Sequence, residues 1–304
     1  MNGRQRQISK PIKQHWTPRF YIKEFSTTET RDTRDPQVWI FSRNEGDPQK
    51  VNIKDVAAKR YLYSPKNEEG VRCWRIEDKL AALESTIGMF WSCIARDFVN
   101  LDEVWVRKGV SLFMATLMLR HPNKMDEYRG LRAQLTSFFD SFPKDASGRP
   151  IIRYLETKHE ALKFDTSNWF KYRNPTEYDR HKLFVDQISY SALDVAKLLM
   201  EKRWSVIFSD EPCFITTDRP VTVFNQEKER FGLATKGTII SFPLSPTRVL
   251  VLDDRFNEPH SQFYPLAEHG PGPINIAHWA HAYNFMISHR HPDDVDYEMV
   301  NLCR

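Results

Sequence analysis

The spacing of hydrophobic residues changes twice along this chain of 304 residues, and this change constrains the fold more than any other feature. Apolar residues recur every three or four positions over residues 74–200, which is the spacing of amphipathic helices. After Trp204 the spacing becomes two, which is typical of half-buried strands. A shorter strand-like region precedes the helical one. Strands at both ends of a helical middle predict an α+β fold, with a mainly antiparallel sheet built from the N- and C-terminal segments.

The helical middle divides into about five predicted helices. The first begins at Trp74, and the second begins near Asn100 or Asp102 and ends at Arg120, because Pro122 prevents continuation. The others are expected at residues 125–138, at 151–162 and from Pro175 to Met200. The third carries an apolar stripe of Met125, Tyr128, Leu131, Leu135 and Phe138. The stripes of the first two predict one buried cluster containing Leu83, Ile87, Phe90, Phe113 and Leu117.

Strands are expected in two groups. Residues 37–42 and 50–53 form a predicted hairpin around a turn with Gly46. The second group comprises residues 205–208, 213–216, 221–224, 238–242 and 248–252, followed by a helix opened by Pro273 and a last strand at 285–288. A lone hairpin is marginal in water. We therefore expect it to join the strands around Phe214, Phe242 and Leu250 in one sheet.

A chain of this length can form one large domain or two fused subdomains. The shared sheet favours a single unit over residues 1–304. Residues 14–64 would supply the N-terminal part of the sheet and residues 74–200 the helical insertion, while residues 204–304 would supply the C-terminal strands and a helix.

The composition favours an intracellular, cytoplasmic protein. No stretch approaches the roughly 20 apolar residues that a membrane span needs, and the polar N-terminus lacks a signal-peptide core. The four cysteines are scattered without a Cys-x-x-Cys pair, which argues against zinc ribbons, iron–sulfur sites and disulfide frameworks. No metal site is predicted, and the sequence identifies no cofactor.

Positive charge is concentrated at the N-terminus. The net charge is only +4, yet residues 1–19 contain five basic residues and no acidic one. Such an arm suits a phosphate-bearing partner, RNA or a nucleotide, but it can also be a solvated tail. Both interpretations stay open.

Several short segments occur in an order that resembles a known family. They are His15-Trp16-Thr17-Pro18-Arg19-Phe20-Tyr21, Leu83-Glu84, Arg120-His121-Pro122, Phe214-Ile215-Thr216-Thr217-Asp218-Arg219-Pro220, Phe242-Pro243-Leu244-Ser245-Pro246 and Ile274-Asn275. In this order they resemble the bacterial domain-of-unknown-function 4238 family over nearly the whole chain. Arg219 departs from the asparagine or small polar residue usual there. The resemblance supplies no established chemistry, but members in anti-phage defence islands imply an effector role.

Three residues are candidates for catalysis, each with a structural alternative. His15, beside the basic arm, could act as a general acid or base, or could bind a backbone carbonyl and fasten the N-terminus. Asp218 could orient His15 or hold a divalent cation, or could form an Asx-turn. Arg120 could hold an anion, or could be placed by the helix dipole.

Four further residues are candidate binding residues. Glu84 lies near the apolar face of the first helix, so Arg120 on the next helix is its expected partner. The segments that resemble the family add Arg19, Tyr21 and Asn275.

Two hypotheses follow. The first is an effector enzyme, nuclease-like or nucleotide-directed, that hydrolyses or transfers phosphate on RNA or a nucleotide and responds to a possible protein trigger. The second is a non-enzymatic binding or sensing module in which the same residues are structural. Metal ligation by His278 and His281, and an Arg153–His159 ribonuclease pattern, are weaker alternatives. An open cleft shared by His15, Arg120 and Asp218 would favour the enzyme.

Overall fold

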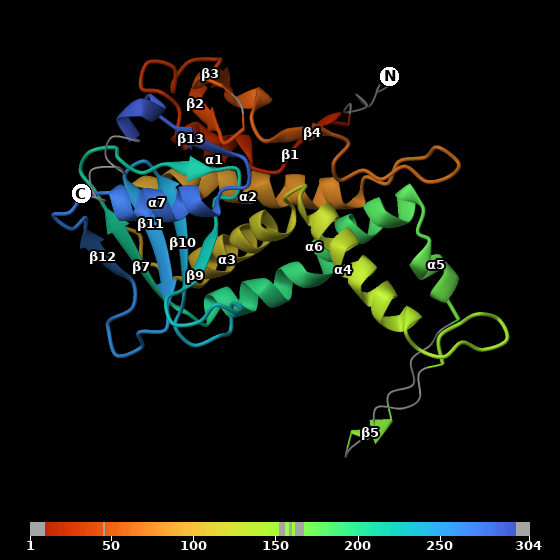
Figure 1. Cartoon of the computed structure of the whole chain (residues 1–304). Helices are drawn as coiled ribbons and strands as arrows, with labels where there is room; N and C mark the ends of the chain where they lie inside the picture. The colour runs from red at the N-terminus through yellow and green to blue at the C-terminus, as the bar shows by residue number, and fades with distance from the viewer. Residues whose placement is uncertain (1–9, 45, 152–155, 158–159, 162–166, 296–304) are drawn as a thin grey trace, which may run out of the picture.

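The computed structural model describes residues 10–44, 46–151, 156–157, 160–161 and 167–295. Its architecture is α+β, with mostly antiparallel sheets at one side and a helical insertion that extends from them (Figure 1). The fold class therefore agrees with the hydrophobic spacing of the sequence. None of the helices in these described ranges is long and apolar enough to span a membrane.

The N-terminal segment forms short elements around one hairpin. These are β1 (Lys13–His15), α1 (Arg19–Glu24), β2 (Gln37–Ser42), β3 (Gln49–Asn52), the 3-10 helix η1 (Ile53–Asp55) and β4 (Ala58–Arg60). β2 and β3 are the predicted hairpin, with Val38 opposite Val51, and β1 pairs with β4 in a separate ribbon. Pro18 is the N-cap of α1, whereas the Thr17 side chain is buried and does not cap the helix.

The helical insertion contains α2 (Arg75–Arg96), α3 (Val104–Leu119), α4 (Lys124–Asp140), α5 (Trp169–Arg173) and α6 (Glu177–Met200). Four of the predicted helices are confirmed, and α3 stops just before Arg120, as the following Pro122 requires. The helix predicted at 151–162 falls largely outside the described residues. Its described part consists of the strands β5 (Glu156–Thr157) and β6 (Glu160–Ala161), so the helical prediction is wrong there.

The C-terminal segment contains β7 (Arg203–Phe208), β8 (Thr216–Thr217), β9 (Thr222–Asn225), β10 (Thr238–Ser245), β11 (Arg248–Asp253), β12 (Gln262–Pro265), α7 (Gly272–His281) and β13 (Phe285–Ser288). One five-stranded sheet has the order β12-β7-β11-β10-β9, and only its β12–β7 pair is parallel. One face of this sheet, with Phe242 and Leu250, packs on α2 and α3. The other face, with Val249, packs against α7 (Figure 1).

A second sheet joins both ends of the chain. Its order is β3-β2-β13-β8, with Ile40 opposite Ile287 and Ile287 opposite Thr216. A sheet of mixed origin is therefore confirmed, but the expected single sheet is wrong, because the strands of Phe242 and Leu250 belong to the other one. Those strands pair with each other and with β9 and β7, so neither has a free edge for the hairpin.

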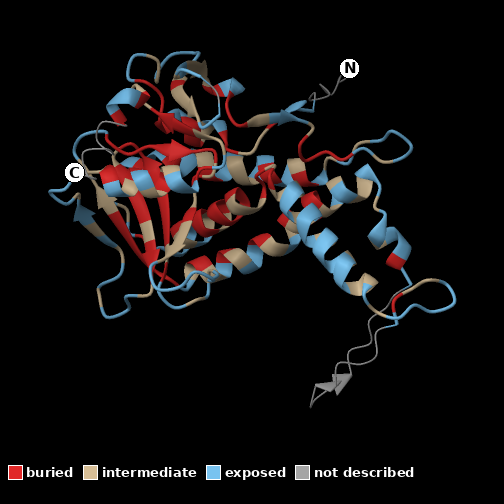
Figure 2. Ribbon diagram, viewed as in Figure 1, coloured by how far each residue is buried: buried red, intermediate tan, exposed pale blue. Residues whose placement is uncertain are grey.

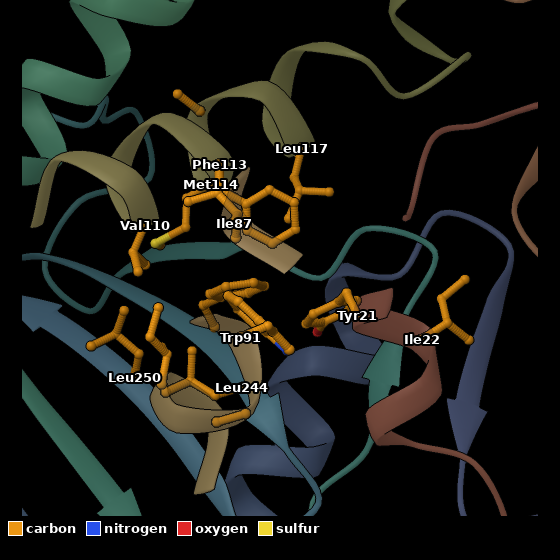
Figure 3. Packing of buried hydrophobic residues seen from close by; sticks show 14 of the residues in the cluster. Tyr21, Ile22, Ile87, Trp91, Val110, Phe113, Met114, Leu117, Leu244 and Leu250 are labelled. Carbon is orange, nitrogen blue, oxygen red and sulfur yellow. The ribbon is translucent and has the colours of Figure 1, made fainter. Parts of the chain in front are cut away.

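The core lies between α1, α2, α3 and the five-stranded sheet. The Tyr21 and Phe242 rings stack at 5.3 Å, and Trp91 and Phe113 close the cluster (Figure 3). The predicted cluster is correct for Ile87, Phe113 and Leu117, which are buried, whereas Leu83 is only partly buried. It is wrong for Phe90, which is 44% exposed and contacts the exposed ring of Trp105 at the surface.

The stripe of α4 is also more exposed than predicted. None of its residues is buried, and Leu131, Leu135 and Phe138 are exposed (Figure 2). Only Met125 and Tyr128, near its start, pack against a buried cluster. The physical reason is that α4 projects from the sheets, so its later turns have little protein to cover them (Figure 1).

Candidate functional site

His15 ends β1 and is fastened to the turn after β3. Its Nε2 lies 3.1 Å from the Lys54 carbonyl oxygen. Because a carbonyl only accepts, Nε2 carries the proton and Nδ1 is unprotonated. Burial, followed by the nearby cations Arg19 and Lys13, lowers the pKa of His15 to about 4. The ring is thus neutral at pH 7, and its contact corresponds to the structural alternative.

Arg120 connects three segments from a fully buried position. Its Nε donates to the Trp16 carbonyl at 2.6 Å, and its Nη1 donates to Glu84 Oε1 at 2.7 Å. Its own carbonyl accepts from the Tyr63 hydroxyl at 2.9 Å. The expected Glu84 pair is therefore present. With 0% of Arg120 exposed, a ligand has no access to its guanidinium in this conformation.

Asp218 joins the turn after β8 to the start of β13. It is 1% exposed, and its two oxygens accept from the backbone N–H groups of Tyr283 at 3.0 Å and Asn284 at 2.8 Å. Its backbone N–H donates to the Phe285 carbonyl at 3.1 Å. Both carboxylate oxygens are thus engaged in holding the chain, and no open cleft reaches them.

The three segments nevertheless meet. His121 Nε2 lies 3.8 Å from Asp218 Oδ2, and the His121 ring contacts Trp16 and Tyr283 edge-on, with centroids 5.6 and 5.2 Å apart. The structure thus brings the segment that follows His15 close to the Asp218 turn. It does so through buried neighbours rather than in a shared cleft, and this geometry favours a structural role for Arg120 and Asp218.

Two of the candidate binding residues, Tyr21 and Asn275, form hydrogen bonds inside the protein. The buried Tyr21 hydroxyl lies 2.7 Å from Thr216 Oγ1 and donates to the Pro243 carbonyl at 2.8 Å, and burial raises the pKa of Tyr21. Asn275 accepts from the Ile215 N–H at 3.1 Å and donates to the Cys213 carbonyl at 2.9 Å. Arg19 is exposed at the start of α1.

The weaker alternatives gain no support from geometry. His278 is buried between the hydroxyls of Thr222 and Ser241, each 2.9 Å away, and burial lowers its pKa to about 3. His281 Nδ1 lies 2.9 Å from the carbonyl oxygen of Ala277 in its own helix. In the described parts of the chain, no group of three or more His, Cys, Asp or Glu could hold a metal ion. The Arg153–His159 pattern lies outside them.

A basic pocket next to β4 was not predicted. We call it the β4 pocket; it has a volume of about 420 Å³. Its charged lining consists of Lys59, Arg60, Lys66, Arg72 and Glu177, with His181 beside them. The loop after β4 and the first turns of α6 bring these residues together.

Tyr61 lines the β4 pocket together with two arginines that lie over its ring. The Arg72 guanidinium lies 3.5 Å from the centroid of the Tyr61 ring, and the Arg60 guanidinium lies 6.0 Å from it. Arg72 also donates to the Ser64 carbonyl at 2.8 Å. Tyr61 has φ +54, a left-handed conformation that is uncommon for residues other than glycine. The surrounding contacts hold this strained backbone in place.

The four Lys and Arg residues of the β4 pocket outnumber the single carboxylate of its lining, Glu177. Among the described residues, Lys59, Arg60, Lys66 and Arg72 form no ion pair with a carboxylate. The sequence did contain a pattern that could have indicated this basic pocket, because residues 59–72 include all four cations and Tyr61. Glu68 and Glu69 in the same stretch obscured it, and both are exposed and absent from the pocket lining.

A comparison with protein families gives one match. The family model described as "Protein of unknown function (DUF4238)" matches residues 13–292. The chain belongs to this family. No curated protein and no solved structure matches it. The residues matched by the DUF4238 model include His15, Arg120 and Asp218 and the whole lining of the β4 pocket.

One carboxyl in this DUF4238 chain has a strongly shifted pKa. Burial, reinforced by the nearby Glu84, raises the pKa of Glu77 to about 7. Glu77 lies in the first turn of α2, just after Trp74, whose ring contacts Tyr61 of the β4 pocket with centroids 6.3 Å apart. Glu77 can therefore exchange a proton near neutral pH.

Proposed function

We propose that this chain is a binding or sensing module that recognises a phosphate-bearing ligand, RNA or a nucleotide, in the β4 pocket. The observation that carries this proposal is the group of four cations around Tyr61 without carboxylate ion pairs. Cations gathered in a hollow create a positive potential that concentrates anions. Arginine also offers forked donors that match phosphate oxygens.

The architecture of the β4 pocket supports recognition of a defined group. Arg72 is held between the Tyr61 ring and the Ser64 carbonyl, so little side-chain freedom remains to be lost on binding. Lys66 and Arg72 lie opposite each other in an antiparallel bridge. Strained backbone such as that of Tyr61 is found most often at functional sites.

A binding role also agrees with the structural contacts of the buried residues Arg120 and Asp218. Arg120 and Asp218 have no surface to offer a substrate, and the neutral His15 is bound to a backbone carbonyl. The effector role that the family resemblance implies would then use ligand binding as its sensing step. A protein trigger would be an additional partner.

The experiment compares the double variant Lys59→Gln/Arg60→Gln with the charge-matched control Lys228→Gln/Arg230→Gln, whose residues lie in an exposed loop and do not line the β4 pocket. Calorimetry at low salt would use ATP and the dinucleotide pUpU as probes. We expect the pocket variant to lose about tenfold or more in affinity and the control to lose little. No binding by the wild type, or equal binding by both variants, would overturn the proposal.

Hydrolysis or phosphotransfer is a second candidate, and Glu77 is the observation that favours it. A carboxyl with a pKa near 7 suits general acid–base catalysis at neutral pH. Glu77 does not line the β4 pocket, but it lies three residues after Trp74, whose ring contacts the Tyr61 ring of that pocket with centroids 6.3 Å apart.

For this candidate, ATP or a short RNA would be incubated with the wild type and with Glu77→Gln, and the products separated by chromatography. Turnover that disappears in Glu77→Gln, while probe binding is retained, would support catalysis. If the wild type binds the probes but does not turn them over, the catalytic candidate is rejected and the binding role remains.

A further inference from the structure

A second basic hollow adjoins the β4 pocket. We call it the α4 pocket; it has a volume of about 540 Å³ and lies between α4 and the α5–α6 segment. Its charged lining consists of Arg129, Arg132, Arg173, Arg180 and Asp140. Met125, in the first turn of α4, lines both pockets, so the two hollows are neighbours.

The arginines of the α4 pocket differ in their contacts within the described part of the protein, and Arg129 pairs with Asp126, outside the lining, at 3.1 Å. The Arg132 guanidinium lies 5.3 Å from the Tyr172 ring centroid, and its Nη1 is buried without a hydrogen-bond partner among the described residues. Arg180 donates to the Pro175 carbonyl at 2.9 Å. Only Arg173 pairs with the single carboxylate of the lining, Asp140, at 3.1 Å. The pocket thus offers guanidinium groups that an added anion could bind.

The charge of the two pockets taken together suits a ligand with repeated phosphates. Eight Lys and Arg residues face two carboxylates, Glu177 and Asp140. A mononucleotide would occupy one hollow and leave the cations of the other hollow without an anionic ligand. Hollows of about 420 and 540 Å³ are the size of small-ligand sites and too small for a duplex. Tyr61, Tyr128 and Tyr178 in the linings offer rings to unpaired bases.

We propose that single-stranded nucleic acid binds along both hollows, from the β4 pocket past Met125 into the α4 pocket. This inference rests on the proposed function and specifies its ligand class. Phosphates contact the guanidinium and ammonium groups of each hollow, and bases reach the tyrosine rings. Chain length, rather than base identity, governs affinity until both hollows are filled.

The test measures fluorescence anisotropy of labelled pUpU and of the octamer U8 over a series of salt concentrations. The double variant Arg132→Gln/Arg180→Gln should bind pUpU like the wild type but lose affinity for U8. Its plot of log affinity against log salt should be less steep by about 1.4, since each phosphate contact to a single strand contributes about 0.7. The control is again Lys228→Gln/Arg230→Gln, and Arg129→Gln at an exposed position should lower the slope by about 0.7 without affecting folding.

A DNA octamer, dT8, and an eight-base-pair RNA duplex complete the set. We expect dT8 to bind comparably to U8 and the duplex to bind no better than pUpU. If U8 binds no more tightly than pUpU, or if neither α4 pocket variant changes U8 affinity or its salt slope, the inference fails while the proposed function stands. If the wild type binds neither pUpU nor U8, both fail.

Discussion

Arg120 shows how a fully buried charge can be accommodated. Removal of a guanidinium from water is costly unless hydrogen bonds and an opposite charge replace the lost hydration. Here the Trp16 carbonyl and Glu84 provide part of that replacement, at 2.6 and 2.7 Å, while the buried Nη2 has no hydrogen-bond partner among the described residues. One residue therefore ties the end of α3 to both the N-terminal segment and α2.

We expect Arg120→Met to lower the free energy of unfolding by about 3 kcal/mol, because Glu84 and the Trp16 carbonyl lose their partner. The control is Arg129→Met, which breaks only the exposed pair with Asp126 and should cost less than about 0.5 kcal/mol. Urea denaturation gives both values. Equal stability of the two variants would show that the Arg120 contacts do not hold the α3 end.

Glu77 should affect stability in a pH-dependent way. Its pKa is about 7 in the folded state and near the ordinary 4.5 in the unfolded chain, so the folded state holds more protons between these values. The free energy of unfolding of the wild type therefore falls as pH rises through this window. Relative to the wild type, Glu77→Gln should gain on the order of 1 kcal/mol from pH 5 to pH 8, after allowance for solvent screening.

Urea denaturation at the two pH values measures this difference. Glu68→Gln, in an exposed loop, is the control and should follow the wild-type pH profile. A constant gap between Glu77→Gln and the wild type would contradict the raised pKa.

Among the elements, α6 contributes to both basic hollows, and its start is well defined. Thr176 Oγ1 accepts from the Asp179 N–H at 3.1 Å, and Asp179 Oδ2 accepts from the Thr176 N–H at 3.2 Å, which forms a capping box. The next turns present Glu177 and His181 to the β4 pocket and Arg180 to the α4 pocket. The cap therefore orients residues of both sites.

Thr176→Ala should lower the free energy of unfolding by about 1 kcal/mol, because the Asp179 N–H at the helix start loses its side-chain acceptor. Thr86→Ala, in the middle of α2, removes a threonine that caps nothing and should change stability little. Chemical denaturation compares the two. If Thr176→Ala lowers the free energy of unfolding no more than Thr86→Ala does, the capping box does not stabilise the start of α6 and packing determines where this helix begins.

At the scale of the whole molecule, β13 holds the two ends of the chain together. It pairs with β2 of the N-terminal hairpin on one side and with β8 on the other. The hairpin has too few strands to be stable alone. Its folding is therefore coupled to that of a segment more than 240 positions later in the chain.

We expect unfolding in urea to be a single cooperative transition, with coincident curves from tryptophan fluorescence and far-UV circular dichroism. The reason is that the mixed sheet and the large core both contain segments from the two ends of the chain. Separate midpoints would instead indicate that α4 and α5, which have few buried residues, unfold as a unit of their own.

Local chemistry was sufficient for much of the architecture. Hydrophobic spacing predicts α2, α3, α4 and α6, and Pro122 predicts where α3 ends, because these signals depend on residues within a few positions of one another. The Glu84–Arg120 pair also followed from the sequence, since consecutive helices bring their stripes together. A sheet shared by both termini followed from the instability of a lone hairpin.

Only the tertiary structure decided which strands meet, which parts of each stripe are covered and which charges gather. The hairpin pairs with β13 because the strands of Phe242 and Leu250 already have partners on both edges. Phe90 is exposed because its side of α2 faces the surface, where it contacts the exposed ring of Trp105. The β4 pocket combines Arg60 and Arg72 with His181, more than 100 positions later. Spacing within a segment carries no information on such distances, which depend on how the elements pack.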